Sequence, residues 1–279
     1  MVSINGTDAR QISIDLLLPV GVATVLVLVH LLVPLRMRSS MAFSPDFFSI
    51  YSLLTAPYVH ADAVHLLENV VLFLLTASLV YFLTLCLRFR RWFHATAVGL
   101  LVGLPIVHNL LVYVIATLLA LEEPAAQFGF SSIGAGFAAF LFVALLAYIE
   151  DGYGRSGITA ILGFLVVVIS LVVGISLLTG VSTIVLGAGL VGLLVAAGWY
   201  QCRQAKILRR QARRESPVPT DATVLAVAVF VFALEFFSLF QVGLDLSEVL
   251  LSHGIPFGIG IVASLVAYRI ASDENAGGD

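Results

Sequence analysis

Residues 64–87 read VHLLENVVLFLLTASLVYFLTLCL, an apolar run with a single acidic side chain, Glu68. A helix needs about 20 predominantly apolar residues to cross the hydrocarbon core of a bilayer. This run is long enough, and it lacks the strict polar–apolar alternation of a transmembrane strand. A segment in lipid must also satisfy its own backbone hydrogen bonds. The run therefore predicts a transmembrane helix.

The rest of the chain has the same apolar character. Of its 279 residues, 60% are hydrophobic and only 11% are charged, and the mean hydropathy is +1.07. Soluble domains carry about 25% charged residues, so a water-soluble globule and a disordered chain are excluded. The net charge of −3 offers no basic face for a polyanion, which excludes a nucleic-acid partner. We expect an all-α integral membrane protein, a polytopic helical bundle embedded in the lipid bilayer.

Further apolar runs are bounded by charged residues, Pro or Gly. Together with the first run they predict about eight transmembrane helices, at residues 14–35, 64–87, 95–119, 129–149, 157–179, 182–202, 222–242 and 247–268. The break near Gly180 is set by length, because one helix of about forty apolar residues would overshoot the bilayer. We expect these helices to form a single membrane domain over residues 1–279.

The basic residues predict the direction of these helices. Loops on the cytoplasmic side of a membrane carry an excess of Lys and Arg. With a cytoplasmic N-terminus, all but two of the 14 Lys and Arg residues fall on the cytoplasmic side, and the exceptions are Arg36 and Arg38. The basic stretch 201–220 is the longest hydrophilic loop. We therefore expect a multi-pass protein of the plasma membrane with both termini in the cytoplasm.

Several polar side chains lie at one expected depth in the membrane. Polar and ionisable residues inside spans are costly and usually face partners or water. In the predicted orientation, His65 and Asn69 lie in the first turns of the second helix. Ser131 lies near the start of the fourth helix and His253 near the start of the eighth. All four residues are therefore expected near the outer face.

The histidine, asparagine and serine side chains at this depth suit nucleophilic catalysis by a serine. His65 and Asn69 are four residues apart and share a helix face, where two donors can stabilise a developing negative charge on oxygen. The N-terminal N–H groups of the helix that Ser131 begins also suit an oxyanion. His253 can remove the proton of the Ser131 hydroxyl. Together they predict a serine nucleophile, a histidine base and an oxyanion hole.

Three sequence motifs resemble those of the rhomboid family of intramembrane serine proteases. Residues 55–69, TAPYVHADAVHLLEN, are similar to the family's second-helix motif, in which a histidine precedes His-x-x-x-Asn by five residues. Gly129-Phe130-Ser131-Ser132 resembles Gly-x-Ser-Gly, and His253 matches the helix that carries the base. The resemblance covers about residues 45–150 and 245–268. Two additional helices and the basic loop are expected within about 157–220.

The resemblance implies a rhomboid-like core and an intramembrane endopeptidase. Ser131 and His253 would form a catalytic dyad that cleaves transmembrane protein substrates near the outer membrane face. His65, Asn69 and the backbone N–H of Ser131 would form the oxyanion hole, with His60 as a supporting histidine. No cofactor and no metal are expected, because a base activates the hydroxyl.

Three departures from the family pattern favour an alternative function. Ser132 replaces the glycine after the nucleophile, and Ala135 stands where many members carry an aromatic residue. In the last helix, Pro256 occupies a usual glycine position, whereas Gly260 fits the next one. The alternative is a catalytically inactive rhomboid-like protein that binds transmembrane helices without cutting them.

The remaining polar residues allow a third class, a membrane protein that carries a metal or protons through its histidines. The chain lacks the His-Glu-x-x-His spacing of a zinc peptidase. His108 and Asn109, on the third predicted helix, are expected to bridge helices. Glu235, on the seventh, is expected to form a hydrogen bond within the bundle rather than to line a cavity that water enters.

Overall fold

The computed structural model describes residues 3–4, 7–45, 48–119, 128–151, 220–239 and 249–276. Regular structure in these ranges is helical, apart from the antiparallel pairing of β1 (Ser3–Ile4) with β2 (Thr7–Asp8). The chain divides into two compact units. The first contains Met1–Ala144 and Leu244–Asp279, and the second contains Leu145–Gly243. The five candidate site residues all belong to the first unit.

The first unit contains both long apolar helices and short ones. They are α1 (Ala9–Leu32), α2 (Leu35–Met41), α3 (Ser52–Thr55), α4 (Ala63–Cys86), α5 (Arg90–Val98), α6 (Leu104–Leu118) and α11 (Ile255–Ala276). A 3-10 turn (Ala56–Tyr58) follows α3, and π-helical turns join α5 to α6 (Gly99–Gly103) and precede α11 (Leu250–Gly254). Another helix covers Ser131–Asp151, and α9 (Thr220–Leu239) belongs to the second unit.

Five of the described helices are long and apolar enough to cross a membrane. They cover Ala9–Leu32, Ala63–Cys86, Arg90–Leu118, Ser131–Asp151 and Leu250–Asp273, and a shorter apolar helix covers Val224–Leu239. These correspond to the first four, the eighth and the seventh predicted runs. The predicted helices at 157–179 and 182–202 lie outside the described residues. The described chain is an all-α bundle with helices of membrane-spanning length, which confirms the predicted class.

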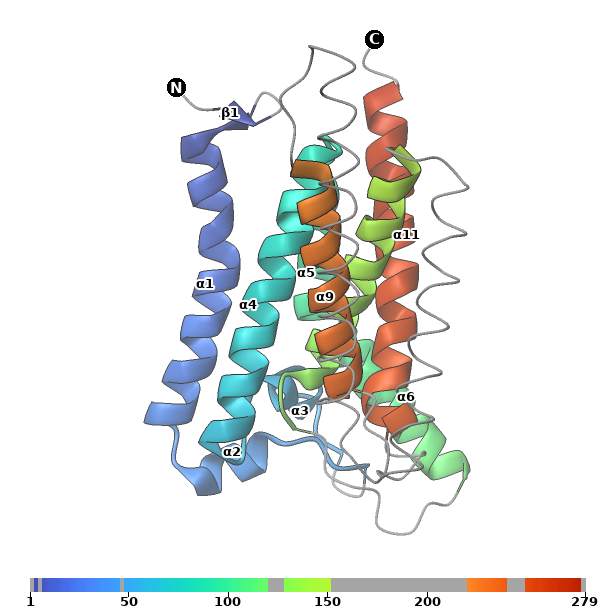
Figure 1. Cartoon of the computed structure of the whole chain (residues 1–279). Helices are drawn as coiled ribbons and strands as arrows, with labels where there is room; N and C mark the ends of the chain where they lie inside the picture. Colours follow the sequence, from blue (N-terminus) through green and yellow to red (C-terminus); the bar gives the residue numbers. More distant parts are fainter. Residues whose placement is uncertain are drawn as a thin grey trace, which may run out of the picture. The chain divides into compact units, whose positions relative to one another are not determined.

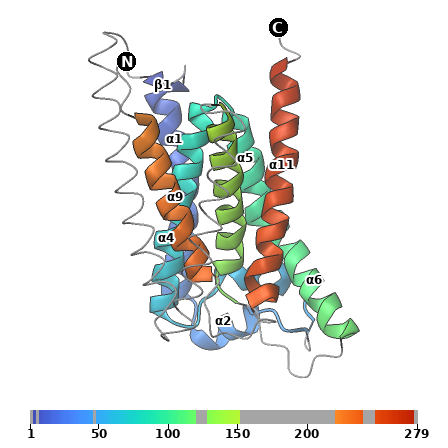
Figure 2. The same ribbon diagram turned by 45° about the vertical axis from the view of Figure 1, so that its right-hand side comes forward.

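The Ser131–Asp151 helix is the most enclosed of the five, with 78% of its apolar window buried against 22% for α1. Figure 2 shows it between α4 and α11. On the α4 side, the Phe73 ring packs edge-on against the Phe137 ring. On the α11 side, a Cβ added at Gly260 would lie 2.7 Å from the Gly136 carbonyl oxygen. Small residues permit such close helix packing in membranes, and this contact brings the start of α11 to the start of the Ser131–Asp151 helix.

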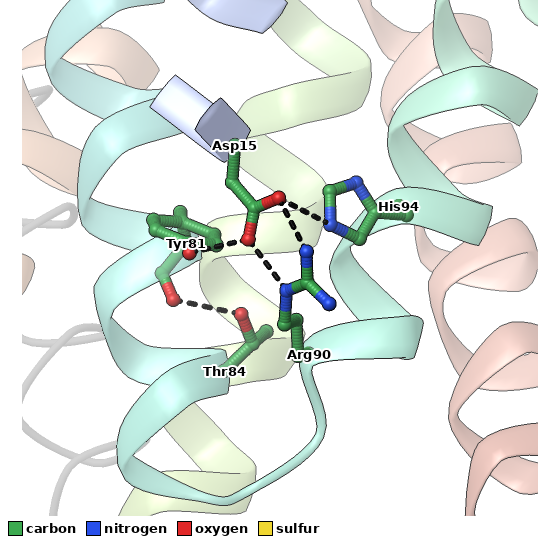
Figure 3. A network of polar contacts seen from close by, with 5 residues as sticks. All are labelled: Asp15, Tyr81, Thr84, Arg90 and His94. Atoms are coloured by element: carbon green, nitrogen blue, oxygen red, sulfur yellow. Dashed lines mark hydrogen bonds and ion pairs between the residues drawn. The ribbon is translucent and has the colours of Figure 1, made fainter. Parts of the chain in front are cut away.

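A buried carboxylate joins α1 to its neighbours. Figure 1 shows α1 beside α4, and Asp15 of α1 is only 5% exposed. Its oxygens accept hydrogen bonds from Arg90 Nε (2.6 Å) and Nη2 (2.7 Å) and from the Tyr81 hydroxyl (2.6 Å). His94 Nε2 lies 3.2 Å away (Figure 3). Pairing offsets the large cost of burying a charge, so this cluster ties α1 to α4 and α5.

Candidate active site

Ser131 and His253 meet at one end of the bundle. Ser131 is the first residue of its helix, and His253 lies in the π-helical turn Leu250–Gly254. His253 Nε2 is 3.3 Å from Ser131 Oγ, and both residues are half-buried. Nucleophile–base contacts are often slightly long when no substrate is bound. The predicted proximity of the hydroxyl and the imidazole is therefore present, with each group on a different helix.

The loop that leads into Ser131 requires a glycine. Gly129 has φ +100, a conformation that side chains with a Cβ rarely adopt. A Cβ at this position would also lie 3.1 Å from His65 Cε1. The Gly129 N–H donates to the Ala56 carbonyl at 3.2 Å. This loop consequently passes directly against the His65 ring, which brings His65 next to the segment that carries Ser131.

His60 connects the start of α4 to the loop that leads into Ser131. Its Nε2 accepts hydrogen bonds from the Phe130 backbone N–H and from the Asn69 side-chain amide, both at 3.2 Å. A ring nitrogen that accepts carries no proton, so His60 is the neutral tautomer protonated at Nδ1. Burial lowers the pKa of His60 to about 4, and the nearby His65 contributes in the same direction. His60 thus acts as a neutral acceptor between α4 and the residue before Ser131.

Asn69 and His65 both lie next to His60. The His60 and His65 rings meet edge-to-face, with centroids 5.5 Å apart. Asn69 is half-buried, and its amide group carries two hydrogens, of which the contact with His60 uses one. The structure therefore brings His60, His65 and Asn69 together beside the start of the Ser131 helix, and the second amide hydrogen of Asn69 can serve a developing oxyanion.

Asp62 fixes where α4 begins. It is the N-cap residue, and its side chain accepts a hydrogen bond from the His65 N–H at 2.9 Å. That bond lowers the pKa of the Asp62 carboxyl, which therefore stays ionised at neutral pH. The cap places His65 in the first turn and Asn69 one turn later. The sequence contains the signal for this cap, because an aspartate directly before an apolar run is typical of a helix start.

Arg38 is a site residue that sequence reasoning missed. Its Nη1 donates to the His60 carbonyl at 2.5 Å and lies 2.6 Å from His30 Nδ1. A pocket of about 150 Å³ adjoins this contact, with Arg38, Val59, His60 and Phe128 among its lining residues. The useful indication in the sequence was that Arg38 stands outside the positive-inside pattern, since a basic residue there needs a local partner.

The residues that depart from the family motifs are enclosed. Ser132 is 7% exposed, and Ala135 is completely buried. Pro256 is the second residue of α11 and directly follows the π-helical turn that carries His253. The chain therefore accommodates this proline by changing the helical hydrogen-bond pattern next to the candidate base.

The remaining polar residues singled out in the sequence do not belong to the group around Ser131. His108 Nε2 lies 2.8 Å from the Leu251 carbonyl, and the Asn109 amide donates to the Leu53 carbonyl at 2.8 Å, so both residues bridge elements as predicted. Glu235 is buried on α9. Within the described ranges, no group of three or more His, Cys, Asp or Glu side chains is arranged to hold a metal ion.

Comparison with family models, with curated proteins and with solved structures finds no match for this chain. Its function is therefore inferred from the geometry of its own residues.

Proposed function

We propose that this chain is a rhomboid-like intramembrane serine endopeptidase that cleaves transmembrane protein substrates with a Ser131–His253 dyad. The observation that carries the proposal is the 3.3 Å separation of His253 Nε2 and Ser131 Oγ. Three further features support it. Both groups are partly accessible, Ser131 begins a helix, and His65 and Asn69 lie beside the loop that leads into it.

The chemistry follows from these positions. His253 Nε2 takes the Ser131 proton as Oγ attacks the carbonyl carbon of the scissile peptide bond. The oxyanion that forms is stabilised by the Ser131 N–H, His65 and Asn69. The tetrahedral intermediate collapses as the C–N bond breaks, and His253 delivers its proton to the leaving amine. Water, deprotonated by His253, then attacks the acyl ester, and breakage of the ester bond restores the Ser131 hydroxyl.

The proposal includes the arrangement in the membrane. Eight spans would contain a rhomboid-like core over about residues 45–150 and 245–268, with two additional helices within 157–220. Both termini and the basic loop would lie in the cytoplasm of a cell with this protein in its plasma membrane. The dyad would then lie near the outer face, where a substrate helix can unwind and water can enter.

Co-expression with a reporter transmembrane substrate tests the proposal. Ser131→Ala and His253→Ala should each abolish cleavage at unchanged protein level, because each removes one half of the dyad. Ser132→Ala, the adjacent serine, is the matched control and should retain cleavage. In the purified protein, a serine-directed fluorophosphonate should label the parent and not Ser131→Ala. Cleavage that survives Ser131→Ala would reject the assignment.

Three enclosed or unusual residues favour a second function, an inactive rhomboid-like protein that binds transmembrane helices. Ala135 leaves no aromatic ring at its position, Ser132 adds a buried hydroxyl, and Pro256 removes a backbone donor beside the turn that carries His253. This function predicts no fluorophosphonate labelling of folded protein, with an active rhomboid protease labelled in parallel as the control. It also predicts that crosslinking captures an intact transmembrane helix.

A further inference from the structure

The turn that carries His253 contains a backbone carbonyl that the helix itself cannot satisfy. In the π-helical turn Leu250–Gly254, the Ile255 N–H reaches back to the Leu250 carbonyl. The next donor in that pattern would be residue 256, which would serve the Leu251 carbonyl. Residue 256 is a proline and has no N–H. The Leu251 carbonyl consequently needs a donor from another element.

His108 on α6 supplies that donor. Its Nε2 lies 2.8 Å from the Leu251 carbonyl oxygen. Because a carbonyl oxygen only accepts, the proton resides on Nε2 and the imidazole is the donor. His108 is 1% exposed, so no water competes for the bond. Among the described residues, its Nδ1 has no hydrogen-bond partner, and the polar contact of the ring is directed at the turn that bears the candidate base.

We propose that His108 is a positioning residue for His253. It replaces the hydrogen bond that Pro256 removes, and so holds the turn in which Leu251 lies two residues before His253. With the turn held, His253 Nε2 faces Ser131 Oγ. This inference rests on the proposed function and adds a residue to it. An apolar side chain at position 108 would fill the space but leave a buried carbonyl unpaired, which a turn relieves by rearranging.

A second hydrogen bond to the last helix, α11, provides a matched comparison for the His108–Leu251 bond. The Trp92 indole Nε1 donates to the Ser264 carbonyl at 2.8 Å. This is also a buried side-chain N–H bonded to a carbonyl of the last helix, but it lies eleven residues, about three turns, beyond His253. Trp92→Phe removes a comparable bond without touching the turn, so it controls for a merely structural contribution.

The test compares His108→Leu, His108→Gln and Trp92→Phe in the full-length protein in detergent, with a reporter transmembrane substrate. His108→Leu should lower kcat about tenfold to a hundredfold, the scale of a small displacement of a catalytic group, and leave KM within about twofold. His108→Gln retains an amide donor and should recover most of kcat. Trp92→Phe should keep kcat near the parent value.

A second measurement does not depend on activity. In protein labelled with ¹⁵N-histidine, the His253 imidazole resonances should shift or broaden in His108→Leu and stay unchanged in Trp92→Phe. His253→Gln identifies those resonances. If His108→Leu fails to fold, His108→Asn takes its place, since its shorter amide cannot reach Leu251.

The two proposals fail in different ways. A parent protein without Ser131-dependent cleavage overturns the proposed function, and the His253 resonances then still decide whether His108 holds the turn. Ser131-dependent cleavage in the parent, combined with unchanged kcat and unchanged His253 resonances in His108→Leu, overturns the positioning role alone.

Discussion

At the scale of single residues, the protonation state of His60 matters most for the candidate site. Two donors, the Phe130 N–H and the Asn69 amide, point at the same ring nitrogen. Protonation of that nitrogen would remove the acceptor and set a charge against both donors. The low pKa of His60, about 4, agrees with this arrangement.

The stability of the protein should therefore fall in mild acid. The unfolded chain binds a proton at the ordinary histidine pKa of 6.5, whereas folded His60 binds it only near 4. Protons thus favour the unfolded state between these values. Stability is fully present above 6.5 and declines as the pH falls towards 4, by about 3 kcal/mol in total. Thermal unfolding in detergent from pH 8 to pH 4 measures this.

His60→Gln is the control for the pH dependence. It is neutral throughout this range, so the decline between pH 6.5 and pH 4 should become shallower in the variant. An identical slope in the parent and in His60→Gln would show that other groups cause the acid sensitivity.

At the scale of elements, α11 packs closely against the Ser131–Asp151 helix. An alanine Cβ at Gly260 would lie 2.7 Å from the Gly136 carbonyl oxygen and 2.8 Å from its Cα. These are backbone atoms, so the helices themselves would have to separate. The Ser131–Asp151 helix carries Ser131, and the turn that carries His253 leads directly into α11, so the spacing of the two helices is part of the site.

Gly260→Ala should accordingly destabilise the protein by about 1–3 kcal/mol, the usual cost of overpacking, and should reduce cleavage. Gly258→Ala is the matched control, because a Cβ there meets nothing within 4 Å. It should leave stability unchanged or raise it slightly, since alanine favours a helix. Thermal unfolding of both variants in detergent checks this, and equal melting temperatures would contradict the close contact.

The polar cluster around Asp15 sets where the third long helix begins. The apolar run predicted a start at residue 95, but the helix begins at Arg90. The Arg90 guanidinium is paired with Asp15 of α1, so the charged residues before the apolar run join the helix. The Asp15–Arg90 pair joins the first and third apolar runs, and nothing in the sequence of either run indicates its partner.

Asp15→Asn and Arg90→Gln should each destabilise the protein, because each leaves a partner in the cluster unpaired. The Arg90 side chain is 40% exposed, which reduces the expected loss to about 1–3 kcal/mol. The double variant should lose less than the sum of the two single variants. Thermal unfolding of the four proteins provides the cycle, and strict additivity would show that the pair does not interact.

At the scale of the whole molecule, the basic residues predict how the chain lies in the membrane. Single cysteines at Ala125→Cys and Ala212→Cys, in a chain with Cys86→Ser and Cys202→Ser, test this. A membrane-impermeant maleimide should label position 125 in intact cells and position 212 only after lysis, because basic loops stay in the cytoplasm. The reverse pattern would place the dyad at the inner face.

The amino-acid sequence alone determined the helical membrane class and the approximate positions of the long helices that the structure describes. Hydropathy and length are properties of each stretch by itself, so runs such as 64–87 predict α4 to within one residue at either end. Ser131, His253, His65, Asn69 and His60 could also be selected, because helix position and motif spacing are visible along the chain.

Only the tertiary structure decided which atoms meet. The contacts of Asp15 with Arg90, of Arg38 with the His60 carbonyl, and of His108 with Leu251 join residues far apart in the chain. Hydropathy does not distinguish these partners, because each depends on how the helices rotate and approach one another. The separation of His253 Nε2 and Ser131 Oγ has the same origin, since it depends on the close packing of two helices at Gly136 and Gly260.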